Sequence, residues 1–162
     1  MKGPICNVCL NSDIMCISCK KKVESGDVKD IDITVLKTLN NISKEFKPLA
    51  DVEIKKIVEG EKILVIVTKQ GDGPRIIGKK GVMVKKISKL IGKPLRVVED
   101  CSDVKEFIEK LITPIPIVGI NVIYSPEGEI LKVLIPRGRK IPMSKSSFGE
   151  IVNIMFSKKA IV

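Results

Sequence analysis

The sequence contains no histidine and no tryptophan, and aromatic residues make up 3% of its 162 residues. Without histidine the chain lacks the usual general base, which excludes Ser-His-Asp and Cys-His catalytic arrangements. We also find no nucleotide-binding Walker sequence and no constellation of paired carboxylates. We therefore expect a protein that is not an enzyme.

Long apolar runs are also missing. No run is long enough to span a bilayer, and the first residues do not form the apolar core of a signal peptide. A composition of 44% apolar and 30% charged residues is typical of globular chains and excludes a disordered one. We expect a cytoplasmic monomer that does not enter the membrane.

Charge is unevenly distributed along the chain. The formal net charge is +10, which favours anionic partners such as nucleic acid. The segment 69–96 holds a single acid, Asp72, and nine basic residues: Lys69, Arg75, Lys79, Lys80, Lys85, Lys86, Lys89, Lys93 and Arg96. The alternative interpretation is a solvated lysine-rich helix face, as in thermophilic proteins. Most of the positive charge is therefore concentrated in one short region.

A Gly-x-x-Gly turn lies within this basic region. The sequence Ile76-Ile77-Gly78-Lys79-Lys80-Gly81 separates two apolar segments that favour helix. Glycines allow a phosphodiester backbone to approach closely, and the following helix offers amide groups and the positive end of its dipole. Lys79 and Lys80 add point charges where phosphates would lie. The turn predicts a phosphate-binding clamp.

Four of the five cysteines fall near the N-terminus with the spacing C-x2-C-x6-C-x2-C: Cys6, Cys9, Cys16 and Cys19. Each C-x-x-C pair can turn two sulfurs toward one centre, and two pairs complete a tetrahedron that zinc accepts. Four thiolate ligands leave no open coordination position for catalysis. We expect one structural zinc ion, which would supply folding energy to a segment too short to bury its own core.

Three alternatives to zinc remain for these cysteines. Disulfides fit poorly with a chain expected in the cytoplasm. An iron–sulfur cluster is compatible with four sulfur ligands, although the spacing differs from the common ferredoxin runs. A redox module in which the C-x-x-C pairs cycle is also compatible with the spacing. The fifth cysteine, Cys101, is expected to be a small apolar filler.

Hydrophobic periodicity predicts mixed helices and strands after a basic linker at 20–29. Residues 30–46 follow a helical period that ends at Pro48, and apolar residues at 84, 87, 90 and 91 predict a helix packed on a sheet. Strands are expected at 52–58, 63–67 and 95–98, with short and long helices on either side of the Gly-x-x-Gly turn. The expected order in residues 30–100 is α-β-β-α-α-β.

An internal repeat extends this order to the C-terminus. The segment 59–67 reappears as 127–135 at an offset of 68 residues, which also places Pro142 under Pro74 and Gly149 under Gly81. Chance similarity between two alternating segments is the alternative. The second copy replaces the Gly-x-x-Gly turn by Ser146-Ser147-Phe148-Gly149, so we expect a degenerate unit in which Phe148 would crowd a phosphate.

These motifs resemble a type II KH domain. Their sequence is similar to that of the archaeal NusA-like transcription factors, which carry two consecutive KH domains. The resemblance covers residues 30–162, well in the first copy and weakly in the second; the cysteine-rich head is not part of the short archaeal form. The implied fold is α+β, with a four-cysteine zinc knuckle or ribbon and basic linker at 1–29, a KH unit at 30–100 and a degenerate one at 101–162.

The resemblance implies that single-stranded RNA is the ligand. Gly78, Lys79, Lys80 and Gly81 would clamp its backbone, and the implied groove floor includes Ile77 and Val84, which could equally be plain core. Further phosphate contacts, or simply solvated surface, are expected at Arg75, Lys85, Lys86 and Lys89. The scarcity of aromatic residues argues against an RRM or an OB-fold, which usually stack bases on aromatic side chains.

The leading functional hypothesis is a non-enzymatic factor of transcription elongation or termination that contacts RNA polymerase. The alternative is a ribosome- or translation-associated RNA-binding adaptor, in which the zinc head contacts protein. The redox module is the third hypothesis.

Overall fold

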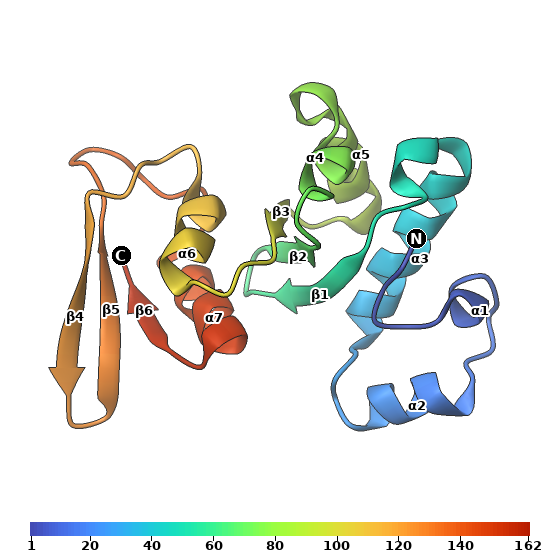
Figure 1. Cartoon of the computed structure of the whole chain (residues 1–162), viewed down its shortest axis with the longest axis horizontal. Coiled ribbons are helices and arrows are strands. Elements are labelled where there is room, and N and C mark those ends of the chain that lie inside the picture. The colour runs from blue at the N-terminus through green and yellow to red at the C-terminus, as the bar shows by residue number, and fades with distance from the viewer.

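The computed structural model describes residues 1–162 as a mixed α+β protein (Figure 1). Its helices are α1 (Asn7–Leu10), α2 (Ile17–Glu24), α3 (Asp30–Glu45), α4 (Gly73–Ile77), α5 (Val82–Ile91), α6 (Val104–Ile112) and α7 (Lys145–Phe156), with 3-10 turns η1 (Lys47–Leu49) and η2 (Lys79–Gly81). Its strands are β1 (Ile54–Glu59), β2 (Leu64–Thr68), β3 (Leu95–Glu99), β4 (Gly119–Ser125), β5 (Gly128–Leu134) and β6 (Lys159–Ile161).

The first unit, from α3 to β3, has the element order expected from the sequence. Its sheet has the order β1-β2-β3, with β1 antiparallel and β3 parallel to β2. The amide of Lys29 donates to the Asp32 carboxylate, which fixes the start of α3, and Pro48 lies in the turn that follows the helix. Strand β2 is followed by α4, the η2 turn and α5, so the Gly-x-x-Gly segment lies between two helices.

The second unit is built from α6, β4, β5, α7 and β6, in a sheet of order β4-β5-β6. A single helix, α7, stands where the first unit has α4, η2 and α5. The ungapped offset of 68 residues fails in the strands. Leu64 and Ile66 pack with α3 and α5, whereas their counterparts at that offset, Lys132 and Leu134, lie outside the core because side chains alternate between faces.

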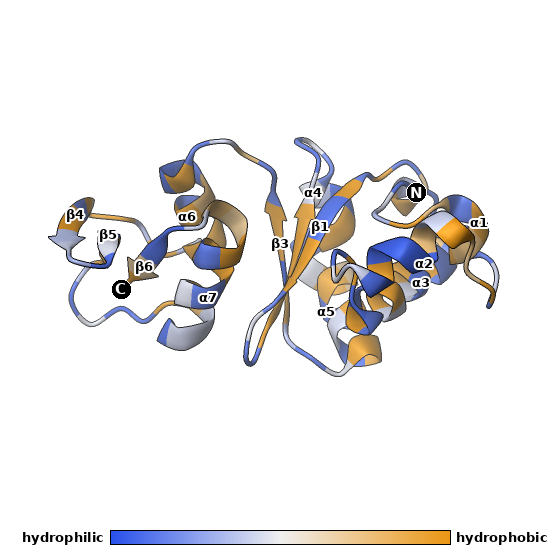
Figure 2. Ribbon diagram, turned by 90° about the horizontal axis from the view of Figure 1, so that it is seen from below, coloured by the Kyte–Doolittle hydropathy of each residue, from blue (hydrophilic) through white to orange (hydrophobic).

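The two units share a hydrophobic core. Every residue of β2 is buried, because its two faces pack against different helix layers. Leu64 and Ile66 belong to a cluster with α3 and α5, whereas Val65 and Val67 belong to a cluster with α6, α7 and the inner face of the second sheet. Figure 2 shows the first sheet between these helix layers, with the second sheet at the far end. The molecule is therefore an alternation of helix and sheet layers.

Polar contacts fix α7 against the β1–β2 turn. The amide of Glu61 donates to the Glu150 carboxylate over 3.1 Å, and the amide of Lys62 donates to the Ser147 hydroxyl over 3.4 Å. A Cβ on Gly60 would lie 3.2 Å from the Cβ of Ser147, so the turn and the helix are in close contact. The second unit is therefore docked on the first.

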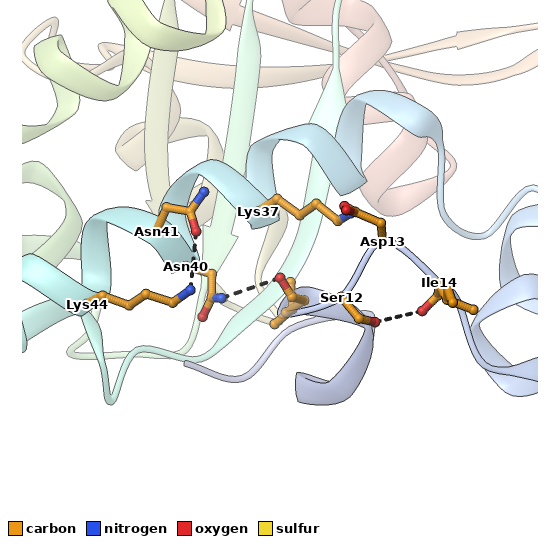
Figure 3. Close-up of polar contacts among 8 residues, drawn as sticks. Ser12, Asp13, Ile14, Lys37, Asn40, Asn41 and Lys44 are labelled. Atoms are coloured by element: carbon orange, nitrogen blue, oxygen red, sulfur yellow. Dashed lines mark hydrogen bonds and ion pairs between the residues drawn. The ribbon is translucent and has the colours of Figure 1, made fainter.

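The cysteine-rich head packs on α3 and contributes to the first core. Ile5, Cys9, Leu10 and Cys19 join that cluster. Figure 3 shows the polar side of this contact: Asn40 donates to the Asn11 side chain over 2.9 Å, and Lys37 lies 3.4 Å from an Asp13 oxygen. The expected linker at 20–29 is wrong in its first part, because residues 20–24 are helical in α2 and Val28 is buried.

None of the helices combines the length and the apolar character that a membrane crossing needs.

Candidate functional site

The Gly-x-x-Gly turn has a left-handed backbone at three of its four residues. The φ angles are 71° at Gly78, 53° at Lys80 and 73° at Gly81. A positive φ is unfavourable for a residue with a Cβ, so Lys80 is held in a strained conformation by its neighbours. The expected glycine requirement is therefore explained by backbone geometry.

Gly78 is also required by space. A Cβ at this position would lie 2.7 Å from the Cβ of Met83, at a φ that already disfavours a side chain. A Cβ at Gly81 would meet nothing closer than 3.7 Å, so only the positive φ selects glycine there. The first glycine therefore lets the turn fold back against α5, and the second begins that helix.

No side chain caps the N-terminus of α5, whose first amide, that of Val82, donates to the Lys79 carbonyl. Its N-cap residue, Gly81, has no side chain to accept from the first amide groups of the helix, such as those of Met83 and Val84. Lys79 and Lys80 are exposed in the turn that precedes the helix. Two exposed lysines thus come directly before the N-terminus of a ten-residue helix, and this combination is suited to an anion.

A groove of about 430 Å³ runs beside the turn. Ile77 and Val84, the expected groove floor, line it. The rest of its wall comes from α4, β3 and α6: Gly73, Pro74, Leu95, Arg96, Val97, Val98, Glu99, Lys110 and Thr113. Ile77 is exposed and Val84 is half-buried, so both side chains can be reached from the groove.

Sequence reasoning missed the part of the groove that the second unit supplies. Lys110 and Thr113 lie in or directly after α6, and the Arg96 guanidinium donates to the Thr113 carbonyl. Burial lowers the pKa of Arg96, and its Nε has no partner. No local motif marks Lys110 or Thr113, so only the docking of the two units could reveal them.

The remaining basic residues do not gather in the groove. Arg75 pairs with Asp72 over 3.5 Å and lines a polar cleft that also includes Met1 and Lys69. Lys85, Lys86 and Lys89 line a shallow hollow on the outer face of α5 with Val82. Leu90, expected to pack on the sheet, is 60% exposed on this helix. The cations therefore surround the turn on several sides.

The corresponding segment of the second unit is not a turn. Residues 146–149 lie inside α7, whose N-cap Ser144 accepts from the amide of Ser147 over 3.1 Å. The expectation that Phe148 would crowd a phosphate is wrong, because its side chain is fully buried in the shared core. This segment is a capped helix and an interface.

The four cysteines of the head form one cluster. Their sulfurs all lie within 4.8 Å of one another, and the Cys6 sulfur is 3.3 Å from that of Cys9 and 3.9 Å from that of Cys16. None of these cysteines is in a disulfide. Sulfur atoms about 3.8 Å apart are expected around one tetrahedral zinc with bonds of about 2.3 Å. The four cysteines could therefore hold one metal ion.

Backbone amides support the charged form of two of the four thiols, whereas the Cys6 thiol raises the pKa of Cys9 and burial raises the pKa of Cys19. The amide of Cys16 donates to the Cys9 sulfur over 3.2 Å, and that of Cys19 donates to the Cys16 sulfur over 3.5 Å. The backbone amide and the thiol of Cys9 lower the pKa of Cys6 to about 7, and the Cys19 amide lowers the pKa of Cys16. Thiolates stabilised in this way are suited to a cation.

Comparisons with known proteins show the fold alone. No model of a known protein family matches the chain, and no curated protein matches its sequence. Solved structures do match, among them one described as "Crystal structure of APE1850". It is similar at a TM-score of 0.58 and 18% identity, over 78% of this chain and 95% of that chain. The α+β fold of this protein is therefore similar to one already seen in a crystal.

Proposed function

We propose that this protein binds single-stranded RNA through the Gly78–Gly81 turn of a type II KH-like unit. The observation that carries the proposal is the turn itself: positive φ angles, an uncapped ten-residue helix and two exposed lysines meet beside an apolar groove. Backbone phosphates would lie against the amides of α5 and the lysines. Unstacked bases would occupy the groove, whose volume of about 430 Å³ and apolar lining suit flat rings.

The experiment compares two double variants with the same change in charge. Lys79→Asp with Lys80→Asp should weaken binding to a short single-stranded RNA about a hundredfold at low salt, because two phosphate contacts become repulsive. Lys20→Asp with Lys21→Asp, on the exposed side of the head, should change it by less than about threefold. Equal losses in the two variants, measured by fluorescence anisotropy, would remove the turn from the mechanism.

We further propose that the head binds one structural zinc ion through Cys6, Cys9, Cys16 and Cys19. The supporting observation is the set of four sulfurs within 4.8 Å of one another, because four cysteine thiolates are a ligand set of structural zinc sites. Protein purified without added metal should contain one zinc per chain by mass spectrometry of the intact protein. Iron with visible absorption would favour a cluster, and metal-free protein with cycling disulfides would favour the redox module.

The finer role proposed is that of a NusA-like factor of transcription elongation or termination in the cytoplasm. A specific observation favours the alternative role as a ribosome-associated adaptor: the head exposes Val8, Ile14 and Ile17 at 72–78% of their surfaces. Exposed apolar residues around a metal knuckle are suited to a protein contact. Affinity purification from cells separates the two roles, because RNA polymerase subunits support the first and ribosomal subunits the second.

A further inference from the structure

Strand β4 is an edge strand with almost none of the usual protection against pairing. It pairs with β5 on one side, and no strand of the chain covers its other side. Within it, Val122, Ile123 and Tyr124 are exposed at 44%, 40% and 79%. The register with β5 is continuous over the whole strand, without a bulge. Such an edge presents a free row of backbone N–H and C=O groups.

The edge strand of the first sheet, β1, has the protective features that β4 lacks. Strand β1 carries Lys55 and Lys56, and its register with β2 shifts between Ile54 and Lys56. Lysines and bulges are common ways in which proteins prevent an edge from pairing with another chain. Lys2 also bridges to Glu53 beside the start of β1. The edge of β1 is therefore protected in ways in which the longer edge of β4 is not.

The lack of charge around β4 favours a second copy of this chain as its partner. Residues 111–126 contain no charged side chain, in a chain that is 30% charged and carries a net charge of +10. The paired strand β5 adds only Glu129 and Lys132, so the excess positive charge of the molecule lies elsewhere. Two copies can approach through this edge without bringing like charges together, whereas the strand offers no charge with which to select a foreign protein.

We propose that β4 pairs antiparallel with β4 of a second copy of this chain, joining two three-stranded sheets into one of six strands. With the two-fold axis at Val122, this side chain lies opposite its own copy, and Tyr124 lies opposite Ile120 of the other copy. These three residues share the face of the sheet that carries buried Leu131. Aromatic and β-branched side chains opposite one another stabilise antiparallel pairs, and a two-fold contact is self-complementary.

The contact is small, so the dimer is weak. One strand pair of this length buries less surface than a standard interface, and we expect a dissociation constant on the order of 10 to 100 μM. The proposal does not depend on RNA binding: the edge lies in the second unit, away from the Gly78–Gly81 turn (Figure 1).

Sedimentation velocity of the full-length protein tests the pairing over about 1 to 500 μM, a range that spans the expected constant. Wild type should shift from monomer to dimer. Val122→Lys and Val122→Glu should each weaken the dimer at least about tenfold, because like charges then lie directly opposite. An equimolar mixture of the two variants should recover dimers beyond either variant alone, since lysine then faces glutamate. Circular dichroism confirms that both variants are folded.

The matched control is Leu90→Lys, which places a lysine at an exposed apolar residue of α5 and should leave dimerisation unchanged. A wild-type protein that stays monomeric throughout the range overturns the proposal, even if another protein pairs with this edge. The proposal is also overturned if Val122→Lys leaves the dimer intact, or if the mixture of the two variants contains no more dimer than either variant alone.

Discussion

Residues 78–81 and 146–149 occupy the same place in two units of similar element order, yet they have opposite structures. The first segment is an open turn with positive φ angles and exposed lysines; the second is a stretch of helix with its first amides capped and Phe148 buried. The difference teaches that one element order can present either an exposed basic turn or a buried docking surface. Which of the two it presents depends on whether the helix is interrupted.

Phe148→Ala should have the largest effect on stability. The side chain is fully buried in the core that both units share, so its truncation should lower the free energy of unfolding by about 3–5 kcal/mol. Urea denaturation measures the loss, and RNA binding per folded molecule should not change. A cost below about 1 kcal/mol would contradict the assignment of this segment to the interface.

Glycine substitutions sharpen the comparison directly. Gly78→Ala should cost about 1–3 kcal/mol, because φ is +71° and the new Cβ would lie 2.7 Å from that of Met83. Gly149→Ala should stay within about 1 kcal/mol, since helix propensity offsets a 3.1 Å contact with the Ala160 carbonyl. Equal costs in thermal or urea unfolding would mean that the two backbones are alike.

Ser147→Ala should have the smallest effect. The hydroxyl accepts from the amide of Lys62 across the two units and lies 2.9 Å from the Ser144 hydroxyl. Its removal should cost about 1 kcal/mol, because a partly buried hydrogen bond is lost. The neighbouring exposed Ser146→Ala should stay within about 0.5 kcal/mol. If urea titrations give the same free energy of unfolding for both variants, the hydrogen bond between Ser147 and Lys62 does not stabilise the interface.

Local signals in the sequence predicted much of the first unit. The period of residues 30–46, the apolar run at 63–67 and the glycines at 78 and 81 each determine structure through near neighbours, and these elements are present. The four-cysteine cluster was predictable for the same reason, because its spacing sets where the sulfurs lie. The groove residues Ile77 and Val84 follow from their position beside the turn.

Contacts between distant segments were not predictable in this way. The burial of Phe148 depends on the contact between α7 and the first sheet. The alignment of Gly149 with Gly81 suggested a turn at this place, whereas the structure has one continuous helix. Leu90 fits a helical period but is 60% exposed, so the period alone did not determine its burial. The offset of 68 residues predicted the wrong buried face of the second sheet. A shift of one residue exchanges the buried and exposed faces of a strand but leaves the sequence similarity nearly intact.

The shared core also sets an order of events during synthesis. Val58, Val65, Val67 and Val98 are covered by helices that a ribosome makes only after the first unit is complete. Until α6 and α7 emerge, the nascent chain exposes a sheet face made of valines and lacks the groove wall at Lys110 and Thr113. The groove beside the Gly78–Gly81 turn is therefore completed late. A chain that stops after β3 should aggregate rather than fold as a smaller version of the protein.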